Sequence, residues 1–270
     1  MATDTPSTPY GDMLERMHHA SPLVQCITNF VAMNYAANVL LAAGASPAMV
    51  HAAEEAAEFA RLADAVTINI GTLSSHWLDG MRAAAKSAND AGKPWVLDPV
   101  AHFATGFRRK AVQELLTLRP TVIRGNASEI MALAGLASAG RGVDAGDSMQ
   151  QAEAAATSLA RITHAVVAVT GATDFVTDGS NAVRIHGGSP LMPRVTAMGC
   201  ALTCLIGAFA AAIREDAFGA TVAALACFSV AGTQAELKSS GPGSFAWRFL
   251  DALSALDAHA IDAQVDRVSA

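Results

Sequence analysis

Short runs rich in β-branched residues alternate with longer, alanine-rich amphipathic stretches along most of the chain, and this alternation constrains the fold most strongly. The short runs are continuously apolar, which is typical of strands that helices cover on both faces. Such strand–helix alternation predicts a mostly parallel sheet. The predicted strands are Ala48–Val50, Val66–Ile70, Trp95–Leu97, Thr121–Ile123 and Val166–Thr170. The helices predicted around them are Phe30–Ala43, Ala52–Leu62, Trp77–Ala91, Ala111–Thr117 and Met149–Ile162.

The later part of the chain departs from this alternation. Turn residues at Asp178 and Gly179 separate two short apolar runs, which predicts a β-hairpin of Phe175–Thr177 and Ala182–Ile185. The remainder is expected to be helical, in the segments Met198–Ile213, Phe218–Leu237 and Phe245–Ala258. Because no linker-like stretch divides the chain, we expect a flexible tail over residues 1–12 and one three-layer α/β/α domain over residues 13–262.

The composition of the 270 residues narrows the class of protein. With 52% hydrophobic and 16% charged residues, the chain is expected to fold around a core rather than to be disordered. A net charge of −6 argues against sequence-independent binding of nucleic acid, which needs clustered lysine and arginine. The longest uncharged apolar stretch, Ala197–Ile213, is shorter than the roughly twenty residues of a membrane span, which favours a buried core helix.

The N-terminus and the cysteines indicate a location. The first residues, MATDTPSTPYGD, lack the basic and apolar segments of an export signal and the arginines of a transit peptide. The four cysteines are widely dispersed, which is typical of reduced thiols. We therefore expect a cytoplasmic protein.

Polar residues follow the predicted strands at equivalent places. Open parallel sheets bind ligands at the carboxyl ends of their strands, so these residues are the candidates for a site. They are Gly71-Thr72, Asp98-Pro99, Arg124-Gly125-Asn126 and Thr170-Gly171. The chain contains neither a G-x-x-x-x-G-K-[ST] phosphate loop nor a G-x-G-x-x-G fingerprint, so the two commonest nucleotide motifs are absent from it.

The segment around Gly199 admits two interpretations. Gly199 lies at the start of a long apolar helix, and the free N–H groups of such a helix N-terminus attract anions, phosphate in particular. Alternatively, Thr196 caps an ordinary core helix in which the glycine permits close packing. Cys200 is then either a small buried residue or a thiol whose pKa the helix dipole lowers. No histidine or second cysteine pair lies at a ligand spacing, so no zinc site is expected.

The segment Arg124–Glu129 also has two interpretations. Asn126 and Glu129 fit the N-x-x-E pattern of a helix cap, which is a purely structural role. Arg124 at the end of a strand is also suited to holding a phosphate, and Glu129 to ordering a hydrated Mg²⁺. Asp98 is either a turn residue or a second carboxylate near that cation.

Seven motifs together resemble the hydroxyethylthiazole kinase family, which belongs to the ribokinase-like superfamily. They occur in order from about Ser21 to Leu250, so the resemblance covers nearly the whole chain, and together they are highly specific. They are S-P-L-V-Q-C-I-T-N-F-V at Ser21–Val31, G-A-S-P-A-M at Gly44–Met49, D-P-V at Asp98–Val100, R-G-N-A-S-E-I at Arg124–Ile130, V-T-G-A-T-D at Val169–Asp174, M-G-C-A-L-T at Met198–Thr203 and G-P-G-S-F at Gly241–Phe245.

The resemblance implies a ribokinase-like fold and ATP-dependent phosphorylation of 4-methyl-5-(2-hydroxyethyl)thiazole at its primary alcohol, a salvage step toward thiamine. It implies that Met49 and the Ala197 backbone touch the thiazole, with Thr28 and Asn29 nearby. It places Cys200 beside the substrate hydroxyl, where ribokinase relatives have an aspartate that acts as base.

The resemblance also implies the nucleotide and metal residues and the assembly. Arg124, Thr170 and Gly199 are expected to contact ATP, and Asp98 and Glu129 to support Mg²⁺. A homotrimer with thiazole sites at the subunit interfaces is expected as well.

Other classes remain open at this point. A sugar or hydroxymethylpyrimidine kinase of the same superfamily is disfavoured by the missing aspartate and by the apolar surroundings of Met49. A ribokinase-like dehydratase that repairs hydrated nicotinamide cofactors is disfavoured by the motifs at Thr28-Asn29 and Gly199-Cys200. The third alternative is a catalytically silent binding module.

Overall fold

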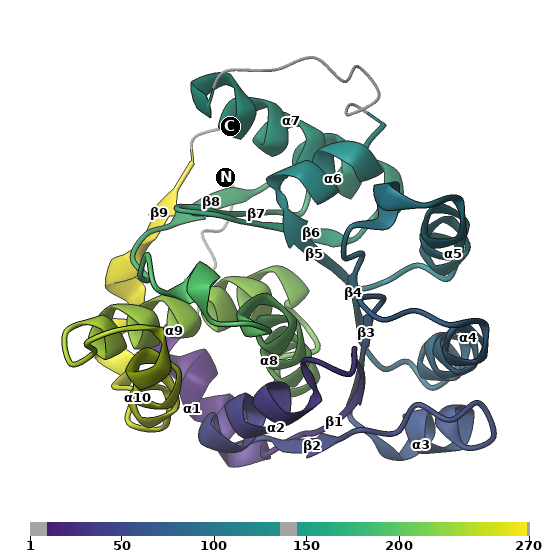
Figure 1. The fold of residues 1–270 in the computed structure, drawn as a ribbon, viewed down its shortest axis with the longest axis horizontal. Coiled ribbons are helices and arrows are strands. Elements are labelled where there is room, and N and C mark those ends of the chain that lie inside the picture. Colours follow the sequence, from purple (N-terminus) through teal and green to yellow (C-terminus); the bar gives the residue numbers. More distant parts are fainter. Residues whose placement is uncertain (1–9, 136–144, 269–270) are drawn as a thin grey trace, which may run out of the picture.

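The structure is a computed structural model that describes residues 10–135 and 145–268 (Figure 1). Residues 1–9 of the predicted tail lie outside this part. The remainder of that prediction is wrong, because helix α1 begins at Tyr10 and extends to Ala20. Its apolar residues Met13, Leu14 and Met17 share one face and are buried in the core, which holds the helix in place.

The central sheet of the described residues has the order β2-β1-β3-β4-β5-β6-β7-β8-β9. The strands from β2 to β6 in this order are parallel, and β7, β8 and β9 join antiparallel. The bounds are β1 Leu23–Ile27, β2 Ser46–Ala48, β3 Ala65–Asn69, β4 Trp95–Asp98, β5 Val122–Asn126, β6 Val166–Thr170, β7 Asp174–Thr177, β8 Ala182–Ile185 and β9 Val265–Arg267.

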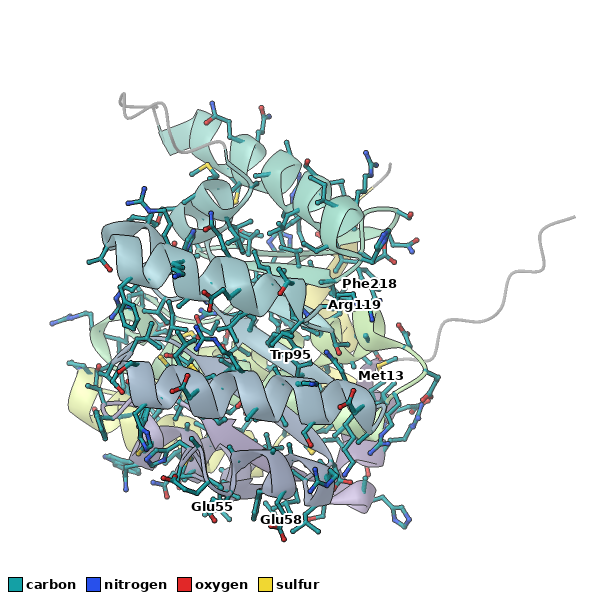
Figure 2. All side chains as sticks on the ribbon, turned by 90° about the vertical axis from the view of Figure 1, so that its right-hand side faces the viewer. Met13, Glu55, Glu58, Trp95, Arg119 and Phe218 are labelled. Atoms are coloured by element: carbon teal, nitrogen blue, oxygen red, sulfur yellow. The ribbon has the colours of Figure 1, made fainter. Side chains whose placement is uncertain are left out.

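One face of the sheet is covered by α3, α4 and α5, and α6 and α7 continue this layer over β5 to β7 (Figure 1). Figure 2 looks onto this layer, with Trp95 of β4 between α4 and α5, and with Glu55 and Glu58 at the outer edge. Ser74 and Thr105 cap α4 and α5 through their side chains. The bounds are α3 Ala56–Leu62, α4 Ser75–Asp90, α5 Gly106–Thr117, α6 Ala127–Leu133 and α7 Ala145–Thr163.

The opposite face carries α1, α2, α8, α9 and α10 (Figure 1). Nearly all of α8 and most of α9 are buried, because alanine, glycine and cysteine let these helices pack closely on the sheet and on one another. The bounds are α2 Met33–Ala42, α8 Met198–Ala212, α9 Ala217–Glu236 and α10 Pro242–Ser254. The result is a three-layer α/β/α architecture, as the sequence predicts.

The five predicted parallel strands and the predicted hairpin are present. The predicted bounds of β6 and β8 are confirmed, and the ends of the other predicted strands are shifted. The sequence pattern missed β1, because Gln25 interrupts its apolar run. The side chain of Gln25 is buried all the same, and its amide donates to the carbonyls of Val50 and Ala56. The pattern also missed β9, which pairs with β8 and carries the sheet to Arg267, past the predicted domain end at residue 262.

Within the described residues, one helix is long and apolar enough to cross a membrane, namely α9. Most of α9 is buried against the sheet and neighbouring helices, which is the environment of a core helix. The stretch Ala197–Ile213, predicted to be a buried core helix, contains α8, which is buried except at Gly199, Cys200 and Ala212.

Candidate active site

The carboxyl ends of β4, β5 and β6 meet the N-terminus of α8 at one edge of the sheet. A cavity of about 300 Å³ opens there. Polar side chains from the strand ends line one side of it, and the backbone that leads into α8 lines the other. Its lining residues are Asp98, Val100, Arg124, Asn126, Glu129, Met192, Pro193 and Val195 to Cys200.

The N-terminus of α8 is open. Its N-cap residue is Ala197, and no side chain of the described residues caps it, so the prediction that Thr196 caps the helix is wrong. Ala197 has φ 68°, in the left-handed region, which costs a non-glycine residue about 1–2 kcal/mol. This backbone turn places Ala197 itself at the N-cap. The first-turn N–H groups of an α-helix have no partner within the helix, so here they are available to a ligand in the cavity.

Gly199 lets an arginine approach the helix closely. A Cβ at this position would lie 2.6 Å from Nη1 of Arg124, so only glycine fits without displacing the guanidinium. Arg124 donates to Oγ1 of Thr170 (2.5 Å) and lies 3.6 Å from Oδ2 of Asp98. Arg124, Thr170 and Gly199, the three residues predicted to bind ATP, therefore lie together.

Asp98 is fully buried at the end of β4. Its Oδ2 accepts hydrogen bonds from Nδ2 of Asn69 (2.7 Å) and Oγ1 of Thr203 (2.9 Å). Its Oδ1 has no partner in the described structure, although it is buried. Burial raises the pKa of Asp98 to about 6, and the nearby Arg124 charge opposes part of this rise.

Both carboxylate oxygens of Glu129 are engaged by the backbone. Oε2 accepts from the N–H of Asn126, whose side chain in turn accepts from the N–H of Glu129, so the predicted cap is confirmed as a capping box. Oε1 accepts from the N–H of Ala101 (2.9 Å), which itself has φ 46°. Glu129 thus ties the loop after β4 to the start of α6.

Cys200 lies in the first turn of α8, partly exposed, with its sulfur 3.2 Å from Nδ2 of Asn29. Burial raises the pKa of its thiol to about 11, and the charge of Asp98 adds to the rise, whereas Asn29 and Arg124 lower it. The lowering expected from the helix terminus alone is therefore outweighed, and the thiol is protonated at neutral pH in the ligand-free chain.

The residues predicted to contact the thiazole are only partly brought together. Ala197 lines the cavity, and Asn29 joins it through Cys200. Thr28 is buried beside Asn29, and its hydroxyl has no partner in the described part of the chain. Met49 lies after β2, half-buried against the core of α2 and α8, and is not among the residues that line the cavity.

Sequence reasoning missed Asn69, Thr203 and Arg108. Asn69 and Thr203 hold Asp98, and Arg108 on α5 donates to the carbonyls of Ile70, Gly71 and Val100, which brace two loops at the edge of the cavity. Asn69 is the last residue of β3, and a predicted strand that ended at Ile70 hid it. A polar residue near the end of an otherwise apolar strand was the available signal.

The donors for a metal are few. No group of three or more histidine, cysteine, aspartate or glutamate side chains able to hold a metal occurs in the described ranges. Sites that bind Mg²⁺ together with substrate phosphates use one or two carboxylates, with water completing the shell. Asp98, whose Oδ1 lacks a partner, and the adjacent Glu129 are the carboxylates that line this cavity.

The parallel sheet, with polar residues at its carboxyl edge and an open helix N-terminus above them, forms the three-layer fold expected from the resemblance to ribokinase-like proteins. A solved structure of Staphylococcus aureus pyridoxal kinase in complex with ADP has the same fold, with a TM-score of 0.58, 17% identity, and coverage of 79% of this chain and 88% of that one.

The comparisons also show the particular family. The model of the hydroxyethylthiazole kinase family matches residues 14–259. A hydroxyethylthiazole kinase from Rhizobium johnstonii is 70% identical over 98% of this chain and 99% of its own length, and one from Cereibacter sphaeroides (strain KD131) is 62% identical over 93% and 95%. The structure of the Pyrococcus horikoshii protein superposes with a TM-score of 0.89 at 41% identity, covering 96% and 99%. The chain belongs to the hydroxyethylthiazole kinase family and is a phosphotransferase.

Proposed function

We propose that this chain transfers the γ-phosphoryl group of ATP to the primary alcohol of 4-methyl-5-(2-hydroxyethyl)thiazole, giving the thiazole phosphate of thiamine salvage. The observation that carries the proposal is the open N-terminus of α8, which faces Arg124 and Asp98 across a cavity of about 300 Å³. Backbone N–H groups and an arginine that face the same cavity can stabilise the negative charge of a phosphoryl group during its transfer.

The nucleotide is held by Arg124, Thr170 and the backbone of Gly199. The Thr170 hydroxyl accepts a hydrogen bond from Nη2 of Arg124, and Asp98 lies near Nη1. The guanidinium is therefore oriented before ATP binds. Orientation of this kind removes part of the entropic cost of binding.

Asp98 and Glu129 support Mg²⁺. The buried Oδ1 of Asp98, which lacks a partner in the described structure, fits a cation, and a bound Mg²⁺ would supply neutralising charge to the phosphates. Both oxygens of Glu129 already accept backbone N–H groups, so Glu129 is suited to a water-mediated contact rather than a direct one.

The substrate alcohol lies beside Cys200, with Met49, Ala197, Thr28 and Asn29 around the thiazole. Phosphoryl transfer through a loose transition state needs little early deprotonation of the alcohol. Because the pKa of the Cys200 thiol is raised to about 11, little thiolate is present at neutral pH to accept the proton, so Cys200 contributes modestly as a base and the α8 amides contribute more of the rate.

The enzyme assembles as a homotrimer with thiazole sites at the subunit interfaces. Phe30 and Val31, which follow Asn29, are 67% and 59% exposed, although apolar side chains of this size are usually covered. Met49 lies outside the cavity lining, so residues of a neighbouring subunit would complete the thiazole site. Light scattering during gel filtration tests this assembly, and a single chain mass at micromolar concentration would contradict it.

A cytoplasmic location and a single kinase domain complete the proposal, and α1 and β9 extend that domain beyond the predicted bounds of 13–262 to Tyr10 and Arg267. All four cysteines are free thiols in the structure, which fits a reducing compartment. The sheet runs without a break from β2 to β9, which supports one domain.

The decisive experiment is a coupled assay of ADP formation by the purified chain with ATP, Mg²⁺ and the thiazole alcohol, with mass spectrometry of the product. A panel of hydroxymethylpyrimidine, ribose and hydrated NADH tests the competing activities. Arg124→Met is expected to lose about a hundredfold in kcat/KM, whereas Arg16→Met, which breaks an exposed pair with Glu215, keeps the parent rate. Preference for another substrate, or no thiazole-dependent ADP, would overturn the proposal.

A further inference from the structure

Asn69 is a buried amide between the two halves of the cavity edge. It is the last residue of β3, only 2% exposed, and it pairs in register with Asp98 of β4. Side chains at paired positions of neighbouring strands point to the same face of a sheet. Asn69 and Asp98 therefore lie side by side on the face that α8 covers.

The direction of the hydrogen bonds around Asn69 is fixed by the backbone. The N–H of Gly71 can only donate, and it lies 2.9 Å from Oδ1 of Asn69. The other end of the amide must then be the NH₂ group, which donates to Oδ2 of Asp98 at 2.7 Å. Asn69 therefore directs its NH₂ group toward the Asp98 carboxylate and its Oδ1 toward Gly71 and Asn29.

The same reasoning fixes the amide of Asn29. The backbone N–H of Ala32 donates to its Oδ1 at 3.0 Å, so its Nδ2 faces the other way. This nitrogen donates to Oδ1 of Asn69 at 2.9 Å and to the sulfur of Cys200 at 3.2 Å. Gly71 packs against Asn29 so closely that a Cβ there would lie 2.8 Å from its Nδ2, which restricts rotation of the amide.

The hydrogen bonds thus form one continuous buried chain from Cys200 through Asn29 and Asn69 to Asp98. It connects the first turn of α8 with the carboxyl ends of three neighbouring strands. Each amide uses both of its ends, and each is anchored at its oxygen by a backbone N–H that cannot reverse.

We propose that Asn69 is a positioning residue that sets the Cys200 sulfur and the Asp98 carboxylate in one fixed arrangement, acting on the sulfur through Asn29 as well as by its own contact with it. In its consequence for the reaction this inference rests on the proposed function, because it sets the alcohol beside Cys200 relative to the phosphates beside Asp98. The hydrogen bond that the sulfur accepts from Asn29 fixes the position of the sulfur without using the thiol proton.

The first test separates the direction of the hydrogen bonds from the shape of the side chain. Asn69→Asp keeps the shape but replaces the donor to Asp98 with a second carboxylate oxygen, and we expect kcat to fall about a hundredfold with the thiazole KM within about threefold of the parent. Asn89→Asp is the matched control, because Asn89 is exposed at the far end of α4. Thermal unfolding checks that both variants fold. If Asn69→Asp does not fold, Asn69→Ser, which removes the amide without adding a charge, takes its place.

The second test asks whether Asn69 acts through Asn29. If it does, the losses in kcat of Asn69→Ala and Asn29→Ala are not additive, and the double variant loses no more than about threefold beyond the worse single variant. Independent, multiplying losses would overturn the proposal.

The third test needs no kinase activity. Cys200 is partly exposed and the other three cysteines are buried, so iodoacetamide should label Cys200 selectively in the folded chain, as peptide mass spectrometry can verify. We expect Asn69→Ala and Asn29→Ala to slow this labelling alike, by threefold or more. A parent or faster rate in Asn69→Ala overturns the positioning role, whereas a parent enzyme without thiazole phosphorylation overturns only the proposed function.

Discussion

The first turn of α8 and the turns that follow it lie over the same sheet and contain the same residue types, but they have different surroundings. Gly199 and Cys200 lie beyond the strand ends, beside Arg124 and Asn29. Cys204 is buried where α8 packs over β1 and β3, and it contacts Cys26 and the Thr67 hydroxyl. Gly207 packs directly on β3, where a Cβ would lie 2.5 Å from Cγ2 of Thr67.

The position of a glycine or cysteine along α8, rather than its residue type, therefore determines whether it lies at the candidate site or packs in the core. Both thiols have a raised pKa: burial raises that of Cys200 to about 11, and the hydrogen bond with Cys26, followed by burial, raises that of Cys204 well above the ordinary range. Only the first turn combines a thiol with open backbone N–H groups and charged neighbours. Substitutions in the first turn are therefore expected to lower activity, and matched substitutions in the later turns to lower stability.

The largest contrast is expected between the two glycines. In Gly199→Ala the new methyl group displaces the mobile end of Arg124, so kcat/KM should fall about a hundredfold or more while the melting temperature changes little. In Gly207→Ala it meets the stiff, buried Thr67, so the unfolding free energy should fall by about 1–3 kcal/mol while the folded enzyme stays active. Kinetics and urea unfolding of both variants test this. Equal loss of activity in the two would break the comparison.

The two cysteines should differ in the same sense. Cys200→Ala is expected to lower kcat about ten- to a hundredfold, since a weak base is lost from a loose transition state. Cys204→Ala is expected to cost about 1 kcal/mol of stability through the cavity left by the sulfur, at an unchanged kcat. Cys200→Asp should retain substantial activity. A parent rate in Cys200→Ala would show that the thiol takes no part in the reaction.

Asp98, at the end of β4 and beside α8, makes the stability of the fold depend on pH. Because burial raises its pKa to about 6, the folded chain holds a proton that the unfolded chain has already released, so this group's contribution to stability is lost as pH rises from about 4 through 6. Urea unfolding at pH 5 and pH 7.5 should show a decline of about 1 kcal/mol from this group. In Asp98→Asn that part of the decline should vanish, and an identical pH dependence in the two proteins would refute it.

The smallest effect is expected from two threonines. The Thr203 hydroxyl lowers the pKa of Asp98 by donating to it, so Thr203→Val should move the acid limb of kcat/KM upward by about half a pH unit. Thr67→Val removes the equivalent hydroxyl beside Cys204 and should leave that limb in place. A shift in both variants, or in neither, would show that the Thr203 hydroxyl does not control the pKa of Asp98.

The sequence predicted the layers of the fold well, because continuous apolar runs and alanine-rich amphipathic stretches determine which faces are covered. It failed where a polar residue is buried by partners distant in sequence. Gln25 hid β1 in this way, since the NH₂ group of its side chain donates to the carbonyls of Val50 and Ala56, which local pattern cannot reveal.

The site was predicted in the same uneven manner. Asp98, Arg124, Glu129, Gly199 and Cys200 stand out because each follows a strand or begins a helix, and the cavity brings them together. The left-handed turn at Ala197 was not predictable, because alanine rarely adopts it and tertiary contacts must hold it. The role of Asn69 depends on its register against Asp98, which only the paired strands reveal.

The order of the elements along the chain has a consequence for its synthesis. The ribosome releases β1 to β6, with Asp98 and Arg124, before α8, which begins at Met198. The part of one apolar face that α1 and α2 do not cover therefore stays exposed until α8 and α9 leave the exit tunnel, and exposed surface of this kind binds chaperones and promotes aggregation. The amides of Gly199 and Cys200 arrive after the strand ends are in place, so a half-made chain carries the carboxylate and the arginine without a cradle for phosphate.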